Sequence, residues 1–302
     1  MRRAALGALI VLLLAPATAG AWGFEAHKFI VARAIDMLPA PIRPFFEANR
    51  AFIVERAIDP DLWRNAGFTQ EPPNHFLDFD AYGPYPFKDL PREYDEALKR
   101  HGIDKLTQNG LLPWRTHEIA GRLIRGFESL NKNGQYAHSD IRFFSAIIGH
   151  YVGDAHVPLH AVLNYNGQLT GQSGIHSRWE EELFVRYETQ LVIKPGPLMS
   201  ISNERDFVFD TLLESSQLAG DVLAADKKAI GNRDVYDDAY FATLFAETRP
   251  ILEKRLSDAI RGVASVITSA WEHAGKPQLS ANPPPRTPQR RRTVPNAERA
   301  NP

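Results

Sequence analysis

The chain has 302 residues, of which 44% are hydrophobic and 24% are charged, and its formal net charge is −1. This composition is typical of a globular protein, and the near-neutral charge excludes a strong overall attraction to nucleic acid or to anionic membranes. The chain has no cysteine, which excludes disulfides, so its stability must come from the size of the core or from bound metal.

Residues 1–21 are predicted to be a signal peptide. Two arginines provide a positive start, residues 4–15 are apolar, and Ala19-Gly20-Ala21 provides the small residues of a cleavage site. A transmembrane helix needs about 20 apolar residues, so this shorter stretch favours export over an uncleaved membrane anchor. Cleavage after Ala21 makes Trp22 the first residue of a mature protein that is secreted or periplasmic.

Beyond the signal, apolar residues recur at helical spacing, and no alternating strand pattern persists beyond a few residues. The first predicted helix begins at FEAHK and ends at Pro39, and Asp140 is expected to cap the helix that leads to Asp154. Further helices are predicted at residues 113–130, after Ser177, at about 206–223 and at about 250–271. The pattern predicts one all-α domain over residues 22–275.

Residues 276–302 differ in kind, because they are rich in Pro, Arg, Asn and Thr and almost free of large apolar residues. Such a composition predicts a disordered tail. Arg290, Arg291 and Arg292 offer a local contact for phosphate or anionic lipid, although a solvated tail without a specific partner is the favoured interpretation.

Three histidines and an aspartate lie within the stretch HYVGDAHVPLH, residues 150–160. His150 and Asp154 are four residues apart on a predicted helix, so both side chains project from one face and can bind one cation. His176 and Glu180 repeat this spacing in HSRWE. A single pair of this kind is more often a surface ion pair, and two pairs leave a metal site and ordinary ion pairs as equal alternatives.

Other candidate ligands lie outside these pairs. His160 follows a proline break, and Asp61 and His75 come from upstream segments that are expected to be non-helical.

Four blocks occur along the chain in the order WGFEAH, DPDLWR…NHFLD, HYVGDAHVPLH and GIHSRWE. On these blocks, which span most of Trp22 to about Arg186, the chain resembles the zinc-dependent phospholipase C and S1/P1 nuclease superfamily. The resemblance implies an all-α phospholipase C/P1 nuclease-like fold around three zinc ions.

The same resemblance implies three groups of ligands. The first zinc is bound by Asp61, His75, His150 and one oxygen of Asp154. The second is bound by the other oxygen of Asp154, by His27, and by the α-amine and carbonyl of Trp22. The α-amine of Trp22 is free only after cleavage. The third is bound by His160, His176 and Glu180. His156 matches no ligand position and is expected to lie among the residues that surround the ligands or to hydrogen-bond one of them.

The activity that the resemblance implies is hydrolysis of phosphodiester bonds. Zinc lowers the pKa of bound water to about 7, so that hydroxide is available for attack at neutral pH. Asp61 and Asp154 are the expected catalytic residues, with Asp61 orienting or deprotonating the nucleophile. Phe76 and Asp78 match the positions that hold a base in the nuclease branch, although phospholipases of the family carry a similar run.

The two branches differ in substrate but share their zinc ligands. Glu180, where nucleases usually have aspartate, the short connection at residues 167–174 and the lack of cysteine slightly favour a phospholipase C-type substrate. A single-strand nuclease or 3′-nucleotidase is the first alternative, and an exported zinc-binding protein without turnover is the second. The expected partner is the phosphodiester substrate, with a transient contact at a membrane surface and no stable protein partner.

Overall fold

The computed structural model describes residues 23–132, 134 and 136–281. All regular elements within these residues are helices, which confirms the predicted all-α class. The α-helices are α1 (Phe24–Met37), α2 (Arg43–Ala48), α3 (Arg50–Arg56), α4 (Asp59–Asn65), α5 (Tyr94–His101), α6 (Ile103–Asn109), α7 (Leu112–Leu130), α8 (Ala137–Ala155), α9 (Ile175–Ser177), α10 (Leu183–Tyr187), α11 (Glu204–Ile230) and α12 (Asp238–His273). The short helical turns are η1 (Pro72–His75), η2 (Phe79–Tyr82), η3 (Pro158–Ala161), η4 (Arg178–Glu182) and η5 (Glu188–Gln190).

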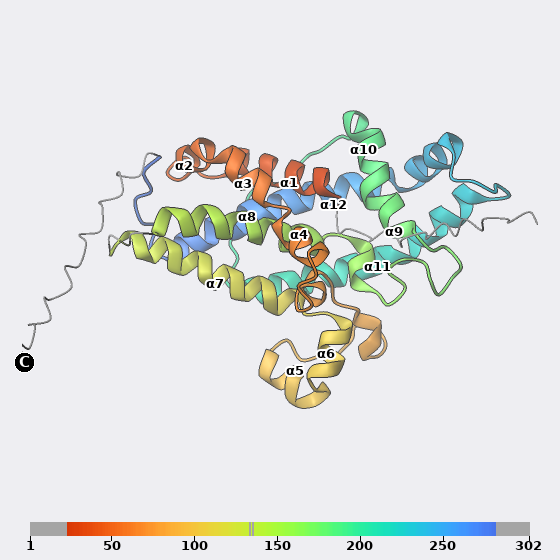
Figure 1. Ribbon diagram of the computed structural model, residues 1–302, viewed down its shortest axis with the longest axis horizontal. Helices are drawn as coiled ribbons and strands as arrows, with labels where there is room; N and C mark the ends of the chain where they lie inside the picture. The colour runs from red at the N-terminus through yellow and green to blue at the C-terminus, as the bar shows by residue number, and fades with distance from the viewer. Residues whose placement is uncertain (1–22, 133, 135, 282–302) are drawn as a thin grey trace, which may run out of the picture.

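The long helices α1, α7, α8, α11 and α12 run along the length of the molecule, and α5 and α6 project from it as a separate lobe (Figure 1). Helix α8 contacts each of the other four long helices. Every residue from 145 to 155 is buried, so this part of α8 faces protein on all sides. A helix in that position is expected to be apolar all round, which makes His150 and Asp154 exceptional.

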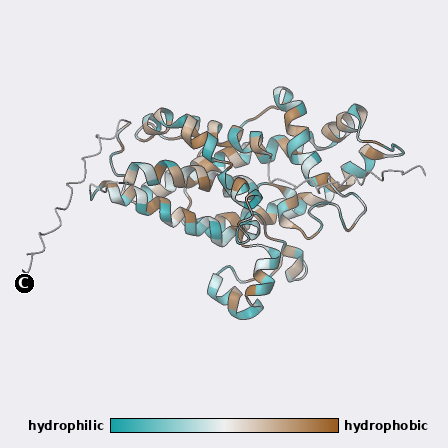
Figure 2. Cartoon of the chain, in the orientation of Figure 1, coloured by the Kyte–Doolittle hydropathy of each residue, from teal (hydrophilic) through white to brown (hydrophobic). Residues whose placement is uncertain are grey.

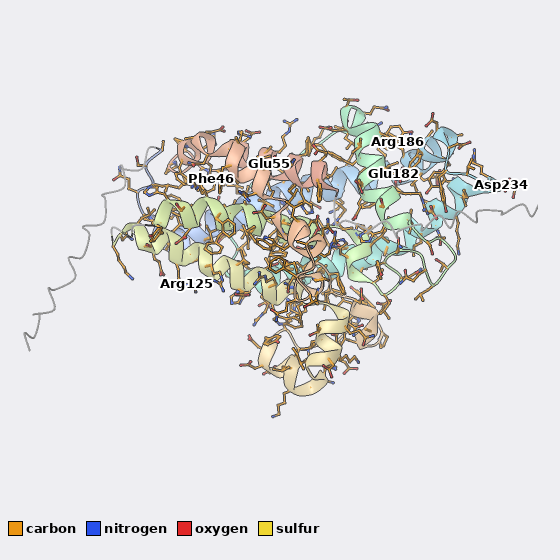
Figure 3. All side chains as sticks on the ribbon, viewed as in Figure 1. Phe46, Glu55, Arg125, Glu182, Arg186 and Asp234 are labelled. Atoms are coloured by element: carbon orange, nitrogen blue, oxygen red, sulfur yellow. The ribbon has the colours of Figure 1, made fainter. Side chains whose placement is uncertain are left out.

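Hydrophobic and hydrophilic residues alternate along the long helices, as Figure 2 shows. Charged side chains such as Glu55, Arg125 and Arg186 are exposed on the outside of the bundle (Figure 3). The apolar residues face inward and form one core to which all five long helices contribute. This division is the one expected of amphipathic helices that share a single core.

The helix boundaries agree with the sequence in part. Helices α1 and α7 occupy the predicted stretches. The capping role predicted for Asp140 is wrong, because α8 begins three residues earlier and Tyr136 takes the N-cap position. Asp140 instead lies in the first turn, where a negative charge favours the helix dipole. The helix predicted after Ser177 begins earlier, at α9, and passes through the π-helical turn η4 before α10.

The last two helices are longer than predicted. Helix α11 extends from Glu204 to Ile230, with the side chain of Asn203 accepting a hydrogen bond from Asp206 N at its start. Helix α12 begins at Asp238, twelve residues before the predicted start, and Pro250 lies inside it. The Asp237 carboxylate caps α12 by accepting from Tyr240 N. An interior proline removes only one backbone hydrogen bond, and the buried residues on both sides of it hold the helix together.

Three predictions concern residues outside the described part of the chain, namely those for the signal peptide, for Trp22 and for residues 282–302 of the tail. The first residues after Gly275 are described. Leu279 is buried, and Pro277 O accepts a hydrogen bond from Trp271 Nε1 at 2.9 Å. Contacts with the helical body therefore extend past the predicted boundary at Gly275.

Candidate metal centre

Two glycines of α8 allow α1 to approach closely. A Cβ atom on Gly149 would lie 2.6 Å from Val31 Cγ2, and one on Gly153 would lie 3.1 Å from His27 Nδ1. Only glycine leaves this space free. The rings of His27 and His150 consequently stack, with centroids 3.9 Å apart. The glycine spacing on α8 thus brings candidate ligands from two helices into one buried layer.

One oxygen of Asp154 faces two imidazoles. Its Oδ2 atom lies 3.0 Å from His75 Nδ1 and 3.3 Å from His150 Nε2. Asp61 Oδ1 completes the group at 3.8 Å from His75 Nδ1 and 4.0 Å from His150 Nε2. Donors bound tetrahedrally to one zinc at about 2.0 to 2.1 Å lie about 3.3 Å apart. His75, His150 and Asp154 are therefore close enough to share one ion, whereas Asp61 groups more closely with His27 and His150. The full set of four ligands for one zinc stays a prediction.

The second oxygen of Asp154 faces different partners. Its Oδ1 atom lies 3.2 Å from His27 Nε2 and 3.9 Å from His160 Nδ1. A carboxylate whose two oxygens face separate groups has the geometry of a bridging ligand. Trp22, the other ligand predicted on this side, lies outside the described residues.

His160, His176 and Glu180 form a further group. Glu180 Oε2 lies 2.9 Å from His176 Nε2 and 3.7 Å from His160 Nε2. The two rings are perpendicular, with centroids 4.9 Å apart. Glu180 belongs to the π-helical turn η4, and such turns are frequent at functional sites.

Backbone carbonyls orient two of the imidazoles. His150 Nδ1 donates to Ala57 O at 2.8 Å, and His160 Nδ1 donates to His75 O at 2.6 Å. In the neutral form of either ring, such a bond places the proton on Nδ1 and leaves Nε2 as the atom that faces the carboxylates. A hydrogen bond that fixes the tautomer in this way is a common feature of metal-ligating histidines.

Arg178 anchors the turn that carries the last group. It lies between His176 and Glu180 in the sequence and is itself buried. Its guanidinium lies 3.2 Å from Asp226 Oδ1 on α11 and donates to Tyr240 OH on α12 at 2.9 Å. A buried charge paired on two sides fixes the position of its backbone. The two ligands on either side of Arg178 are thereby held against α11 and α12.

Most of the buried side-chain polar atoms that lack a hydrogen-bond partner in the described part of the chain belong to these three groups. They include both ring nitrogens of His27 and His176 and both oxygens of Asp61 and Glu180, whose close contacts lack the geometry of hydrogen bonds. Each such atom costs about 1–3 kcal/mol when it is left unsatisfied. Imidazole nitrogens with carboxylate oxygens and no thiolate are donors that suit zinc and similar divalent ions. The residues present therefore fit bound divalent cations.

The protonation states also suit metal binding. Burial lowers the pKa of His27, lowers that of His160 to about 4, and lowers that of His176 well below its usual value. These three imidazoles are thus neutral at pH 7, which is the form that binds metal. Burial, followed by the charges of Asp154 and Asp61, raises the pKa of Glu180 well above its usual value.

His75 and Asp154 interact strongly, and in both residues hydrogen bonds and charges outweigh the effect of burial on the pKa. Burial acts to lower the pKa of His75, but its hydrogen bonds with Asp154 and Glu71 outweigh this and raise the pKa to about 9. Burial acts to raise the pKa of Asp154, but the charge and hydrogen bond of His150 hold it well below its usual value. A cation that takes the place of the His75 proton keeps the Asp154 charge compensated.

Two predicted ligands lie in unexpected elements. Asp61 and His75 were expected in non-helical segments, and this is wrong: Asp61 lies in α4 and His75 ends the 3₁₀ helix η1. Both elements have proline at their first or second position, where it starts a helix without losing a hydrogen bond.

No role was predicted from the sequence for two residues of the centre, Arg64 and Glu71. Arg64 Nη2 lies 3.1 Å from Asp61 Oδ1, one turn away on α4, a spacing that the sequence does contain. Glu71 Oε1 lies 3.5 Å from His75 Nε2 and accepts a 2.5 Å hydrogen bond from Tyr151 OH. Glu71 also lines an open pocket of about 850 Å³. The spacing of four between Glu71 and His75 is a local signal that could have indicated it, whereas its partner Tyr151 is 80 residues away.

Three other predicted residues have contacts of their own. The prediction that His156 hydrogen-bonds a ligand is not what its contacts show: its Nδ1 donates to Val152 O at 2.7 Å and its ring packs against Phe207. Phe76 O accepts from Leu112 N. Asp78 is buried, and burial together with the charge of a neighbouring aspartate raises its pKa to about 7. The substrate contacts expected for Phe76 and Asp78 stay predictions.

The chain is thus an all-α protein with buried clusters of histidine and carboxylate that can hold metal ions. No family model and no curated protein matches the sequence. Among solved structures, the alpha toxin from Clostridium absonum is similar, with 15% sequence identity and a TM-score of 0.47. The match covers 82% of this chain and 63% of that chain, so this chain spans less than two thirds of the toxin. A similarity of this size assigns neither a family nor an activity.

None of the described helices is both long enough and apolar enough to cross a bilayer.

Proposed function

We propose that the protein is a zinc-dependent phosphodiesterase. The observation that carries this proposal is the convergence of His27, His75 and His150 on the two oxygens of Asp154 in a fully buried layer. A purely structural zinc site fills four positions with protein ligands around one ion. Here the candidate ligands form three adjacent groups, and the two oxygens of Asp154 face histidines from different groups, which is the pattern of a multinuclear catalytic centre.

Three zinc ions at these groups would bring six positive charges against the three carboxylates, which attracts a phosphate, polarises its P–O bonds and lowers the pKa of water at the site. The side chains of the protein have separate tasks. Asp61 accepts a hydrogen bond from the attacking water or removes its proton, and Arg64 holds the Asp61 carboxylate at 3.1 Å. Asp154 keeps two groups of ligands at a fixed separation, which aligns the water with the phosphorus.

The proposal includes a ligand from the processed N-terminus. A signal peptide that is removed after Ala21 leaves Trp22 with a free α-amine next to its own carbonyl oxygen. Support comes from Gly23, the N-cap of α1, which lies four residues before His27 on the helix that reaches Asp154 Oδ1. Processing of this kind is also consistent with a secreted or periplasmic location.

A phospholipase C-type substrate is the favoured choice within this proposal, and a single-strand nuclease or 3′-nucleotidase is the second candidate. Both classes present a phosphodiester to the same ligands, so the centre itself does not distinguish them. Support for the first class comes from Glu180 and from the short, uncharged connection between His160 and His176. Phe76 and Asp78 are the residues proposed to contact the substrate next to the centre.

The first experiment measures hydrolysis of bis-p-nitrophenyl phosphate by the mature protein before and after chelation. We expect turnover that chelation abolishes and that added zinc restores. A mature protein that binds zinc but shows no turnover that a chelator can abolish would be a non-catalytic zinc-binding protein, and the proposal would be rejected. Phosphatidylcholine and single-stranded DNA, tested side by side, then separate the two substrate classes.

A further inference from the structure

The loop at residues 162–174 connects two elements of the candidate centre. It follows η3, which carries His160, and precedes α9, which carries His176. In Figure 1 it lies beside α9 and α11. Its sequence VLNYNGQLTGQSG contains no charged residue, although 24% of the whole chain is charged.

The polar side chains of this loop bond the loop itself. Asn164 accepts from Leu169 N at 2.8 Å and donates to Thr170 Oγ1 at 3.1 Å. Gln168 donates to Leu163 O at 2.6 Å and accepts from Asn166 N at 2.9 Å. These bonds bring Leu169 back beside Leu163 and Asn164, so the loop forms a compact turn.

The end of the loop is tied to the body of the protein. Gln172 donates from Nε2 to Leu223 O and to Asp226 Oδ2 on α11, both at 2.7 Å. Asp226 is also the carboxylate that pairs with Arg178 in the turn next to the ligands. Gly167, at a φ of 70°, allows the turn, since a Cβ atom there would lie 2.6 Å from Gln172. The loop is therefore held rigidly in relation to the candidate centre.

The apolar side chains, in contrast, face solvent. Leu169 is 69% exposed, Tyr165 is 44% exposed and Leu163 is 37% exposed. Surface loops usually do the reverse, with polar groups outside, because exposed apolar surface costs free energy. The Tyr165 ring lies edge-on to His176, with centroids 5.9 Å apart, so this apolar surface begins at the candidate centre.

We propose that Leu163, Tyr165 and Leu169 dock the protein on the surface of a zwitterionic phospholipid bilayer. The inference rests on the proposed phosphodiesterase function and names the physical form of its substrate. An uncharged loop offers nothing to attract the phosphates of a nucleic acid, which bind through lysine and arginine. It also loses no ion hydration when it enters the head-group layer, where leucine and tyrosine side chains are favourable.

A second copy of the chain is a poorer occupant of this surface. A stable dimer buries about 800 Å² on each partner, and three partly exposed side chains on one turn provide much less. Partial insertion into a bilayer needs only such a small apolar tip. The rigid tie between the loop and α11 then holds the candidate centre at the level of the head-group phosphates.

The test measures binding to phosphatidylcholine vesicles by co-sedimentation at 4 °C, which limits hydrolysis. We expect Leu169→Ser to lower the partition coefficient about tenfold, which corresponds to about 1.4 kcal/mol, and Leu163→Ser/Leu169→Ser to lower it further. Val192→Ser is the matched control, because Val192 is 46% exposed in a different segment, against α12, and should leave binding unchanged. All three proteins should hydrolyse bis-p-nitrophenyl phosphate at the wild-type rate.

A second measurement uses a variant that keeps the docking surface apolar. Leu169→Trp should show a blue shift of tryptophan emission when phosphatidylcholine vesicles are added, relative to the wild type. The inference is overturned if the wild type does not bind vesicles, if Leu169→Ser binds them as well as Val192→Ser does, or if Leu169→Ser weakens binding to single-stranded DNA instead. Vesicle binding that depends on Leu169, in a protein that hydrolyses no phosphodiester, would support the docking surface while rejecting the proposed activity.

Discussion

Replacement of Asp154 by asparagine is the most direct test of the candidate centre. The substitution keeps the shape of the side chain and removes one negative charge. It also replaces one of the two oxygens by an amide nitrogen, which donates hydrogen bonds and does not bind zinc. Because the two oxygens of Asp154 face His27 on one side and His75 with His150 on the other, both groups are affected at once.

The size of the effect follows from these contacts. Changes to residues that only orient a metal ligand lower the affinity for the metal by about 10- to 100-fold. Asp154 is itself a proposed ligand of two groups, so we expect a loss of at least about 100-fold at each. The group of His160, His176 and Glu180 keeps all three of its ligands and should retain its ion. The content of zinc should therefore fall from about three ions per chain to about one.

The assay is elemental analysis of the mature protein after dialysis against metal-free buffer. Asp59→Asn provides a matched control, because Asp59 is also a buried aspartate but its carboxylate pairs with Arg56 at 3.3 Å. We expect this control to keep the zinc content and the activity of the wild type. An Asp154→Asn protein that keeps three tightly bound ions would refute the bridging role of Asp154. A wild-type protein with well under two ions per chain would refute the centre as a whole.

Three further predictions concern the packing, the pH dependence and the processing of the chain. Gly149→Ala should lower the free energy of unfolding by about 1–3 kcal/mol, because the added Cβ would lie 2.6 Å from Val31. Gly220→Ala, whose added Cβ would have nothing within 4 Å, should raise the free energy of unfolding by up to about 1 kcal/mol. Urea unfolding of the two variants measures the difference. Asp78 has a folded-state pKa raised to about 7, so it binds its proton more tightly when folded, and its contribution to stability is lost as pH rises from about 4 to about 7. Asp78→Asn should therefore match the wild type near pH 4 and be more stable by up to about 4 kcal/mol at pH 8; thermal melts that show the same difference at both pH values would contradict this. A protein that keeps one residue before Trp22 should lose most of its hydrolytic activity, and equal activity of the two forms would rule out the N-terminal ligand.

The sequence predicted the fold class better than it predicted the ends of the helices. Pro250 illustrates the reason. A proline is common at the start of a helix, so the last helix was expected to begin there. The buried residues Phe241, Leu244 and Phe245 continue the helical spacing upstream of it, and their packing outweighs the loss of one hydrogen bond at the proline. Tertiary contacts of this kind cannot be read from a local propensity.

The candidate centre was predictable to different degrees for different residues. The pairs His150 with Asp154 and His176 with Glu180 follow from a spacing of four on a helix, which is local information. The approach of His27 to the same layer depends on which helices cross. No single segment contains that information, and only the resemblance suggested it. The structural reason for it lies in the glycines of α8, which leave room for α1.

The place of Glu71 in the centre depends on contacts between segments that are distant in the sequence. Glu71 lies four residues before His75, which is a local signal, but this spacing alone does not predict its other contacts. Its position is set by Tyr151, whose hydroxyl donates to it, and by Arg115, which donates to the same hydroxyl at 3.3 Å. This chain of contacts joins η1, α7 and α8, so it exists only once the three elements are packed.

The burial of the candidate ligands connects stability with function. His27, Asp61 and Glu180 are 0% exposed and have side-chain atoms without hydrogen-bond partners. Such groups oppose folding, because each loses its hydration and gains little in return. Bound cations reverse the sign of that contribution, and the binding free energy then stabilises the folded state. Because the ions that these atoms would bind are also the groups that would attract the phosphate, removal of metal should destabilise α1 and η4 together with the loss of activity.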